Sequence, residues 1–338
     1  MTSSLRIAVI GSGMAGLSCA VHLQAAGHQV TVFDKSRGVG GRMSTRRTEA
    51  WQCDHGAQYF TARSEAFRAE LARWVQGGVA ALWTPRLQVF GDVAAHRPDA
   101  NLQRWVGAPQ MTAPAQWLAQ GLTLHLETHV QGLRREAQGW RLLGDAARVL
   151  DGAFDRVVLA LPAPQAAHLL TSCSQAQDLA AHADAVRMRG CWALMLHYAQ
   201  PLDLGFDAAF VNTGPLRWVA RNSSKPGRVG AETWLLHAHA DWSDQRLDLS
   251  SELVAQQMLA AFAALGGPAP AAWVVHRWLY ADTGPEALAD DAARADRGSA
   301  CLWRPELALG LCGDWLNGGK VEGAWLSGRA LAAQIMAT

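Results

Sequence analysis

Hydrophobic and polar positions in the first 34 residues follow the order strand, tight turn, helix, strand. The apolar run 6–10 leads directly into a glycine turn, and residues 14–26 have helical periodicity. Gly27 follows where a helix commonly ends, and the β-branched run 29–34 comes next. The pattern predicts a βαβ unit at the start of the chain.

One amphipathic helix is predicted over residues 64–76. Phe67, Leu71, Trp74 and Val75 recur at helical spacing and should lie on one face of it. We expect this face to pack on a hydrophobic core.

Three strands are predicted in the middle of the chain. Residues 122–130 alternate between apolar and polar side chains, and 139–143 is a second short run that should pair with them. Residues 156–161 form a continuous apolar run, typical of a buried parallel strand, which Pro162 ends. This last strand is expected to return to the first sheet.

A second domain is indicated by long β-like runs after residue 166. They cover 191–198, 216–221, 233–242 and 271–281, with one helix at 250–265. The chain then reverts to a strand at 307–314 and a closing helix at 321–336, whereas 285–296 is acidic, rich in alanine and expected to be exposed.

The predicted fold is therefore α/β, with a Rossmann-like domain and a second α+β domain built on a mostly antiparallel sheet. The first domain is discontinuous and comprises residues 1–62, 122–165 and 282–338. The second comprises 63–121 and 166–281.

Composition narrows the possible partners. The 338 residues are 50% hydrophobic and 17% charged, and 30 Lys+Arg against 29 Asp+Glu leave a net charge of +1. Such a balance provides no field that would attract nucleic acid or an anionic membrane. The six cysteines form no C-x-x-C pair, and neither a secretion signal nor an apolar run of about 18 residues is apparent. We expect a cytoplasmic protein with reduced thiols.

The first turn carries the sequence Gly-Ser-Gly-Met-Ala-Gly, a G-x-G-x-x-G pattern between a strand and a helix. Glycines in this pattern permit the turn, admit a pyrophosphate and allow close helix packing, and an acid at the end of the second strand can bind a ribose. The candidate cofactor-binding residues are Gly11, Gly13, Met14, Ala15, Gly16 and Asp34.

A second loop follows Asp34 and contains Lys35, Gly41 and Arg42, which could contact the phosphates or the sugar chain of the same cofactor. Its basic residues could instead form a nucleic-acid patch, but the patch is short and lacks interleaved aromatic residues.

The D-x-x-x-x-x-G-G-R arrangement of this loop resembles the flavin-dependent amine oxidase superfamily. That resemblance implies FAD extended across the first domain, with further contacts near the C-terminus. By the same resemblance the further cofactor residues are Gln58, Tyr59, Val130, Gly313, Asp314, Glu322, Gly323 and Ala324. The segment 317–320 lacks the cysteine that links flavin covalently in many amine oxidases, so non-covalent FAD is expected.

Six blocks, at 34–37, 56–63, 104–107, 220–228, 276–281 and 321–328, resemble the bacterial renalases within that superfamily. This implies a p-hydroxybenzoate-hydroxylase-like architecture with the flavin between the domains. It also implies oxidation of dihydro-NAD(P) isomers that carry hydride at C2 or C6, with O2 as acceptor and H2O2 as product. The expected partners are this dinucleotide and O2, without nucleic acid or membrane, and the chain is expected to be a monomer.

The substrate-pocket candidates are Tyr59, Phe60, Thr61, Trp105, Asn222 and His276. Ordinary core packing is the alternative for Phe60. Trp105, Trp218, Trp234 and Trp278 are expected to face the flavin, and Arg221 and Arg277 to lie near the dinucleotide. Hydride transfer from a dihydropyridine requires no protein base, so no catalytic residue is assigned.

Three alternatives stay open. An oxidase of small amines would use a lysine near the flavin, and only Lys225 is available for that role. A non-catalytic FAD-binding redox sensor would need no substrate. His237, His239 and Asp241 would share one face of an extended strand, but no other ligand cluster accompanies them, so no metal is assigned.

Overall fold

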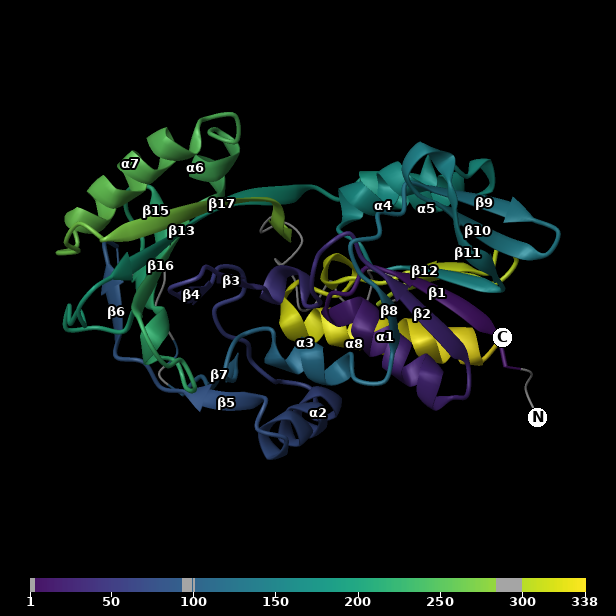
Figure 1. Ribbon diagram of the computed structural model, residues 1–338, viewed down its shortest axis with the longest axis horizontal. Coiled ribbons are helices and arrows are strands. Elements are labelled where there is room, and N and C mark those ends of the chain that lie inside the picture. Colours follow the sequence, from purple (N-terminus) through teal and green to yellow (C-terminus); the bar gives the residue numbers. More distant parts are fainter. Residues whose placement is uncertain (1–3, 93–98, 100, 284–299) are drawn as a thin grey trace.

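The computed structural model describes residues 4–92, 99, 101–283 and 300–338, and it has two lobes (Figure 1). One lobe contains a largely parallel sheet with both termini beside it. The other contains a largely antiparallel sheet. The chain passes between them more than once, so each lobe is built from segments that are distant in sequence.

The first sheet has the strand order β18-β19-β12-β1-β2-β8. The strands are β1 (Arg6–Ile10), β2 (Gln29–Phe33), β8 (Thr123–His125), β12 (Arg156–Leu159), β18 (Leu302–Arg304) and β19 (Leu309–Leu311). All neighbours are parallel except the pair β18 and β19. Both faces of the central strands are buried, which explains the continuous apolar runs of β1 and β12.

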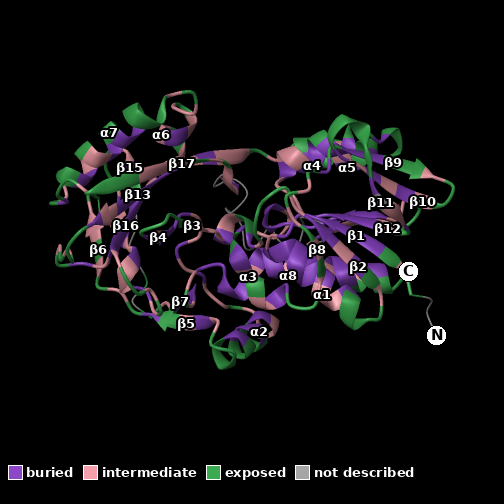
Figure 2. Ribbon diagram, viewed as in Figure 1, coloured by how far each residue is buried: buried purple, intermediate pink, exposed green. Residues whose placement is uncertain are grey.

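Different elements cover the two faces of this sheet. Helices α1 (Met14–Ala25), α3 (Ala113–Leu118) and α8 (Lys320–Met336) lie on one face. The small sheet of β9 (Gly132–Glu136), β10 (Gly139–Leu143) and β11 (Val149–Phe154), with helices α4 (Ala163–Leu170) and α5 (Gln177–Asp184), covers the other. The resulting sandwich is buried at its centre (Figure 2).

The second sheet has the strand order β17-β13-β16-β15-β14-β6. The strands are β6 (Leu87–Phe90), β13 (Met188–Tyr198), β14 (Ala208–Val211), β15 (Leu216–Arg221), β16 (Glu232–Ala238) and β17 (Ala272–Thr283). Helix α7 (Ser251–Ala263) packs on one face through Met258 and Phe262, and the short helix α6 (Ala240–Asp244) lies beside it. The other face points toward the first lobe.

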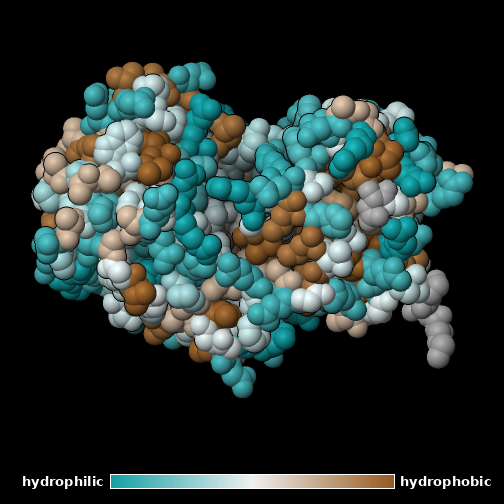
Figure 3. Space-filling view, in the orientation of Figure 1, coloured by the Kyte–Doolittle hydropathy of each residue, from teal (hydrophilic) through white to brown (hydrophobic). Residues whose placement is uncertain are grey.

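Smaller elements connect the lobes. They are η1 (Gly41–Met43), β3 (Thr45–Arg47), β4 (Gln52–Asp54), α2 (Glu65–Gln76), β5 (Ala80–Trp83), β7 (Arg104–Gly107), η4 (Asn222–Ser224) and η7 (Asp314–Leu316). The remaining short turns are η2 (Asp145–Ala147) and η3 (Ser174–Ala176). In the space-filling view the outline is indented between the two lobes, and both hydrophilic and hydrophobic residues lie beside this junction (Figure 3).

The predicted βαβ unit, the strand at 156–161 and the helices at 64–76, 250–265 and 321–336 are confirmed, with ends that shift by a few residues. The strand predicted at 122–130 is wrong in length and pairing: only β8 forms, and it joins β2, whereas β10 pairs with β9 and β11. Val75 is 41% exposed and lies off the buried face of α2.

The domain assignment also changes at residue 166. Helices α4 and α5 bury Ala166, Leu170 and Leu179 against the first sheet, so the chain crosses to the second sheet only at β13. Helix α3 likewise packs with α1 in the first lobe. The acidic segment 285–296 lies outside the described residues.

Candidate cofactor site and active site

The glycine turn after β1 needs its glycines for two different reasons. Gly11 has a φ of +106°, and a Cβ there would lie 2.4 Å from the oxygen of Ala160; a Cβ on Gly16 would lie 2.0 Å from the oxygen of Gly11. Gly13 has an ordinary φ of −74°, and a Cβ there would meet nothing within 4 Å. The protein's own packing therefore requires Gly11 and Gly16 but not Gly13, which leaves room for an outside group.

The start of α1 faces that room. No side chain caps the helix at Gly13, and its first turn holds no acidic residue. The first backbone N–H groups of a helix lack intrahelical partners and favour an anion. A phosphate beside Gly13 would fit into this space and would accept hydrogen bonds from these N–H groups.

Asp34, directly after β2, lies against the same turn. Its carboxylate accepts hydrogen bonds from the backbone N and the Oγ of Ser12, at 2.7 and 2.6 Å, and from the backbone N of Ser36 at 2.8 Å. Lys35 is exposed beside it. The structure thus brings the predicted acid to the glycine turn.

The second glycine loop packs directly on the first. The backbone N of Gly40 donates to the oxygen of Ser12 at 2.9 Å, and a Cβ on Gly41 would lie 3.3 Å from the Cα of Gly13. Arg42 then reaches the end of β19, where it forms two hydrogen bonds of 3.0 and 2.5 Å with the carboxylate of Asp314. Predicted cofactor residues that are 272 positions apart therefore meet.

The start of α8 also reaches this region, where the carboxylate of Glu322 is bonded within the protein. This carboxylate accepts hydrogen bonds from the backbone N atoms of Arg63 and Ser64, at 3.0 and 2.6 Å, just before α2. Glu322 therefore links α8 to α2. Gly323 and Ala324 are buried beside it, whereas Val130 lies on the opposite face of the sheet with Phe33.

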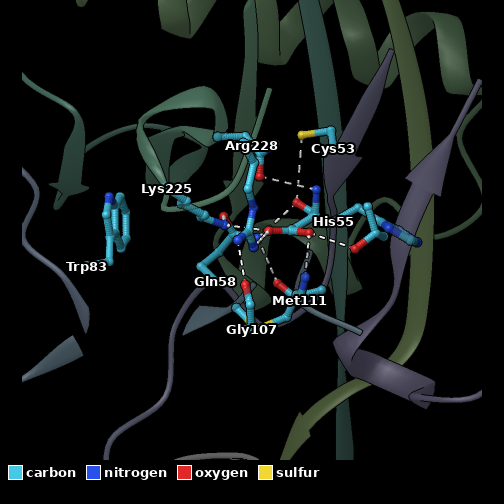
Figure 4. Close-up of polar contacts among 12 residues, drawn as sticks. Cys53, His55, Gln58, Trp83, Gly107, Met111, Lys225 and Arg228 are labelled. Atoms are coloured by element: carbon cyan, nitrogen blue, oxygen red, sulfur yellow. Dashed lines mark hydrogen bonds and ion pairs between the residues drawn. The ribbon is translucent and has the colours of Figure 1, made fainter. Parts of the chain in front are cut away.

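A buried ionic cluster lies where the segment after β4 meets the second lobe (Figure 4). One oxygen of Asp54 binds the Nζ of Lys225 at 3.2 Å and the Nη2 of Arg228 at 2.5 Å. The other accepts from the Oγ1 of Thr45 at 2.7 Å and the backbone N of Met111 at 3.1 Å. Burial opposes ionisation of Asp54, but the two cations and the hydrogen bonds outweigh it and hold the pKa of Asp54 below its usual range.

Lys225 connects this cluster to the predicted flavin segment. Its side chain is 0% exposed, and its Nζ also donates to the Oε1 of Gln58 at 3.0 Å. Burial lowers the pKa of Lys225, and the charge of Asp54 opposes that change. The amide of Asn222 donates to the Oγ1 of Thr233 and accepts from the backbone N of Asp54, so it supports the cluster.

A second group beside the cluster is aromatic and neutral. The ring of His55 stacks on Trp278 at 5.1 Å and meets the edge of His276 at 4.7 Å. The carbonyl of His55 accepts from the Nε1 of Trp278 at 2.9 Å and the Nε2 of His237 at 3.0 Å. Burial, with smaller contributions from neighbouring histidines, lowers the pKa of His55 to about 3, and burial lowers that of His237 to about 4.

Comparison with known families gives two matches. Residues 9–74 match the family described as "NAD(P)-binding Rossmann-like domain". Residues 69–336 match the family described as "Flavin containing amine oxidoreductase". The second match covers most of the chain. The protein belongs to the flavin-containing amine oxidoreductase family. It is accordingly an FAD-dependent oxidoreductase with an α/β fold and a Rossmann-like domain.

Individual relatives are similar only in part. An L-amino-acid oxidase from Sistrurus catenatus edwardsii is 39% identical over 69 residues, which are 20% of this chain and 13% of that protein. A 4,4'-diapophytoene desaturase from Staphylococcus haemolyticus is 48% identical over 52 residues, which are 15% of this chain and 10% of that protein. The matched region thus spans only about a tenth of the length of these relatives.

Solved structures are similar over the whole chain but distant in sequence. Cyclohexylamine oxidase from Brevibacterium oxydans has a TM-score of 0.72 and 14% identity, with 98% of this chain and 99% of that chain covered. Putrescine oxidase bound to putrescine has a TM-score of 0.67 and 14% identity, with 99% and 100% covered. At this identity the likeness shows the shared fold of the family.

The residues present fit FAD. The room beside Gly13 would take the pyrophosphate, and Asp34 would accept hydrogen bonds from a ribose. Arg42 and Asp314 are bonded to each other near this turn and would contact the rest of the cofactor, as the resemblance implies. No cysteine occurs in the segment 317–320, consistent with the non-covalent FAD that is typical of the family.

The predicted pocket residues divide into two groups. Tyr59, Thr61, Trp105 and His276 are partly exposed. Phe60 and Asn222 are buried. Phe60 packs between Phe67 and Trp74 of α2, so the core-packing alternative holds for it, and the amide of Asn222 is bonded within the protein.

Three other predicted positions have partners within the second lobe. Trp234 packs toward α7 in the core of the second lobe, because even-numbered residues of β16 point to that face. Arg221 forms two hydrogen bonds with Glu232, and Arg277 binds the carbonyl of Leu247. Trp218 and Trp278 do contact the segment 55–59.

The alternating residues after Leu236 do not form one site. β16 ends at Ala238; His239 donates to the carbonyl of Val211, and Asp241 lies in the first turn of α6 and pairs with Arg189. Within the described residues, no group of three or more His, Cys, Asp or Glu side chains is placed to hold a metal ion. Nor does any described helix have both the length and the apolar character to cross a bilayer.

Asp54, His55, Arg104 and Arg228 were not predicted as site residues. Asp54 and Arg228 are 174 positions apart, and neither belongs to a chemical motif. The sequence could have pointed to Arg104 and Arg228, because both lie in blocks that resemble the renalases.

Proposed function

We propose that this oxidoreductase oxidises dihydro-NAD(P) isomers with hydride at pyridine C2 or C6, as its resemblance to bacterial renalases implies. Bound FAD would accept the hydride at N5 and reduce O2, so that the dihydropyridine, O2 and one proton give NAD(P)+ and H2O2. A p-hydroxybenzoate-hydroxylase-like arrangement, a cytoplasmic location and a monomeric state belong to the same proposal.

The contacts of the Lys225 side chain are the observation that supports this proposal most strongly. Its ammonium group is enclosed and held by Asp54 and Gln58, so it is not available to a substrate. Asp54, the carboxylate of the cluster, is likewise committed to Lys225 and Arg228. A dihydropyridine becomes aromatic when it loses hydride and needs no base, whereas amine oxidation begins with a neutral amine.

The neutral rings near the segment 55–59 suit a pyridine substrate. Burial lowers the pKa of His276, and His55 and His237 are neutral at physiological pH for the same reason. Together with Tyr59 and Trp278 they present aromatic faces. In this proposal the protein aligns a flat substrate ring and excludes water, and hydride transfer follows from that alignment.

Aerobic turnover tests the proposal. Purified holoenzyme mixed with 2- or 6-dihydro-NAD should form NAD+ and H2O2 in a ratio of one to one. The same measurement with the phosphorylated dinucleotide would establish whether both forms are substrates. Formation of NAD+ without H2O2 would contradict an oxidase.

Oxidation of small amines is the second candidate. It is favoured by the fold shared with putrescine oxidase and cyclohexylamine oxidase. H2O2 formation with putrescine or cyclohexylamine, but with neither dihydropyridine, would establish it in place of the first proposal. A protein that keeps FAD yet forms H2O2 with none of these compounds would favour the redox sensor.

A further inference from the structure

Arg104 is a buried arginine without a carboxylate partner. Only 6% of its surface is exposed, and within the described residues no Asp or Glu lies at ion-pair distance from it. Its Nη1 donates to the carbonyl of Leu102 at 3.1 Å, while its Nε is buried with no hydrogen-bond partner. The other buried cations, Lys225 and Arg228, share Asp54.

An uncompensated guanidinium is costly to bury, because an arginine keeps its charge at all physiological pH values. The neighbours of Arg104 offset little of this cost. Its guanidinium carbon lies 5.4 Å from the centre of the Tyr59 ring, a cation–π contact, and one backbone carbonyl accepts from it. A ligand that supplies negative charge would explain why the chain retains this residue.

A second orphaned donor also lies close to Tyr59. Trp218 is 5% exposed, its ring centre is 5.6 Å from that of Tyr59, and its Nε1 has no hydrogen-bond partner. Two buried donors on different strands, β7 and β15, therefore contact one partly exposed aromatic residue of the predicted pocket. Buried donors of this kind are normally satisfied, so an acceptor from outside the chain is indicated.

We propose that Arg104 binds an anionic phosphate oxygen of the dinucleotide substrate, with the Trp218 N–H as a second donor beside Tyr59. This inference rests on the proposed function, because the dihydropyridine substrates carry phosphates whereas small amines carry none. A cationic amine would be repelled by Arg104. The residue therefore selects between the two candidate substrate classes.

Binding of redox-inert ligands to the holoenzyme tests the assignment independently of turnover. NAD+ carries phosphates and N-methylnicotinamide carries none, and both can be titrated by the change in flavin absorbance. R104Q should weaken NAD+ binding about 10- to 100-fold, the effect of one charge-assisted hydrogen bond, and change N-methylnicotinamide binding less than about twofold. R104K should retain part of the affinity for NAD+.

R135Q is the matched control, because Arg135 also lies over an aromatic ring, that of Trp140, and donates to a carbonyl far from the site. It should leave both affinities unchanged. FAD content and melting temperature, measured for every variant, separate lost recognition from lost folding. Equal weakening of both ligands, a loss of FAD instead of NAD+ affinity, or no NAD+ binding by the wild-type protein would overturn the assignment.

The outcomes also separate the two proposals. If no dihydropyridine is oxidised but NAD+ binding still depends on Arg104, the proposed reaction is wrong and the anion site stands. If the dinucleotide is oxidised and R104Q binds NAD+ as tightly as the wild type, the reaction stands and the role of Arg104 is wrong.

Discussion

Gly13 and Gly16 lie in the same turn but should respond differently to the same substitution. A Cβ at Gly13 meets no protein atom, so Gly13→Ala should leave the melting temperature of the apoprotein unchanged and weaken FAD binding at least tenfold. A Cβ at Gly16 would overlap the oxygen of Gly11, so Gly16→Ala should destabilise the fold itself by about 1–3 kcal/mol. Thermal unfolding with and without FAD distinguishes the two; equal effects on the apoprotein would contradict the assignment of Gly13 to the cofactor.

Substitutions within the ionic cluster around Asp54 should lower the free energy of unfolding by unequal amounts. Asp54→Asn leaves Lys225 and Arg228 buried without a carboxylate and should cost about 3–5 kcal/mol of unfolding free energy. Lys225→Met leaves the Asp54–Arg228 pair intact and should cost less. The double variant should be more stable than Asp54→Asn alone, because it removes one uncompensated cation. Urea unfolding measures all three, and costs that simply add would show that the groups are not coupled.

The buried histidines predict a pH dependence of stability. His55 and His237 have folded-state pKa values of about 3 and about 4, below the ordinary value of 6.5, so between pH 6.5 and 4 the unfolded chain binds protons that the folded chain does not. Stability should therefore fall as pH decreases through this window, by up to about 1.4 kcal/mol per pH unit for each histidine. Urea unfolding at pH 6.5, 5.5 and 5.0 checks this.

His237→Gln is the matched variant for that measurement. It keeps a donor for the carbonyl of His55 but removes one titrating group. The slope of the unfolding free energy against pH should therefore decrease by the amount that corresponds to about one bound proton. An unchanged slope would mean that His237 does not contribute to the pH dependence.

At the scale of elements, the contact between α1 and α8 supports the cofactor turn. A Cβ on Gly328 would lie 2.0 Å from the oxygen of Ala15, within the first turn of α1. Gly328→Ala should push the helices apart, destabilise the protein by about 1–3 kcal/mol and reduce FAD affinity. Ala333→Ser, at an exposed position of the same helix, should change stability by less than about 0.5 kcal/mol. Equal melting temperatures for the two variants would contradict a tight helix contact.

Elements were predictable where one local pattern decides the structure. The turn at 11–16 is recognisable from its glycine pattern alone, and the apolar run of β12 is long enough to identify a buried strand. The alternation at 122–130 was misleading because β8 ends at His125 and Glu127 turns the chain with a positive φ. Asp241 alternates with His239 in sequence, but it lies in the first turn of α6 and off the strand.

At the scale of the whole molecule, the site depends on contacts that no local pattern contains. Asp54 meets Lys225 and Arg228 because β4, which ends at Asp54, packs against the second sheet. Arg104 and Trp218 become neighbours of Tyr59 through three different segments of the chain. The family implies FAD, and in the proposed function the choice of substrate rests on which charged groups are already paired.

Anaerobic mixing of the purified holoenzyme with 2- or 6-dihydro-NAD tests the central proposal most directly. The blue absorbance of the oxidised flavin should bleach within a single turnover, with one NAD+ formed per flavin, and should return when O2 is admitted. Putrescine and cyclohexylamine should leave the absorbance unchanged. Bleaching by the amines and not by either dihydropyridine would contradict the proposed function.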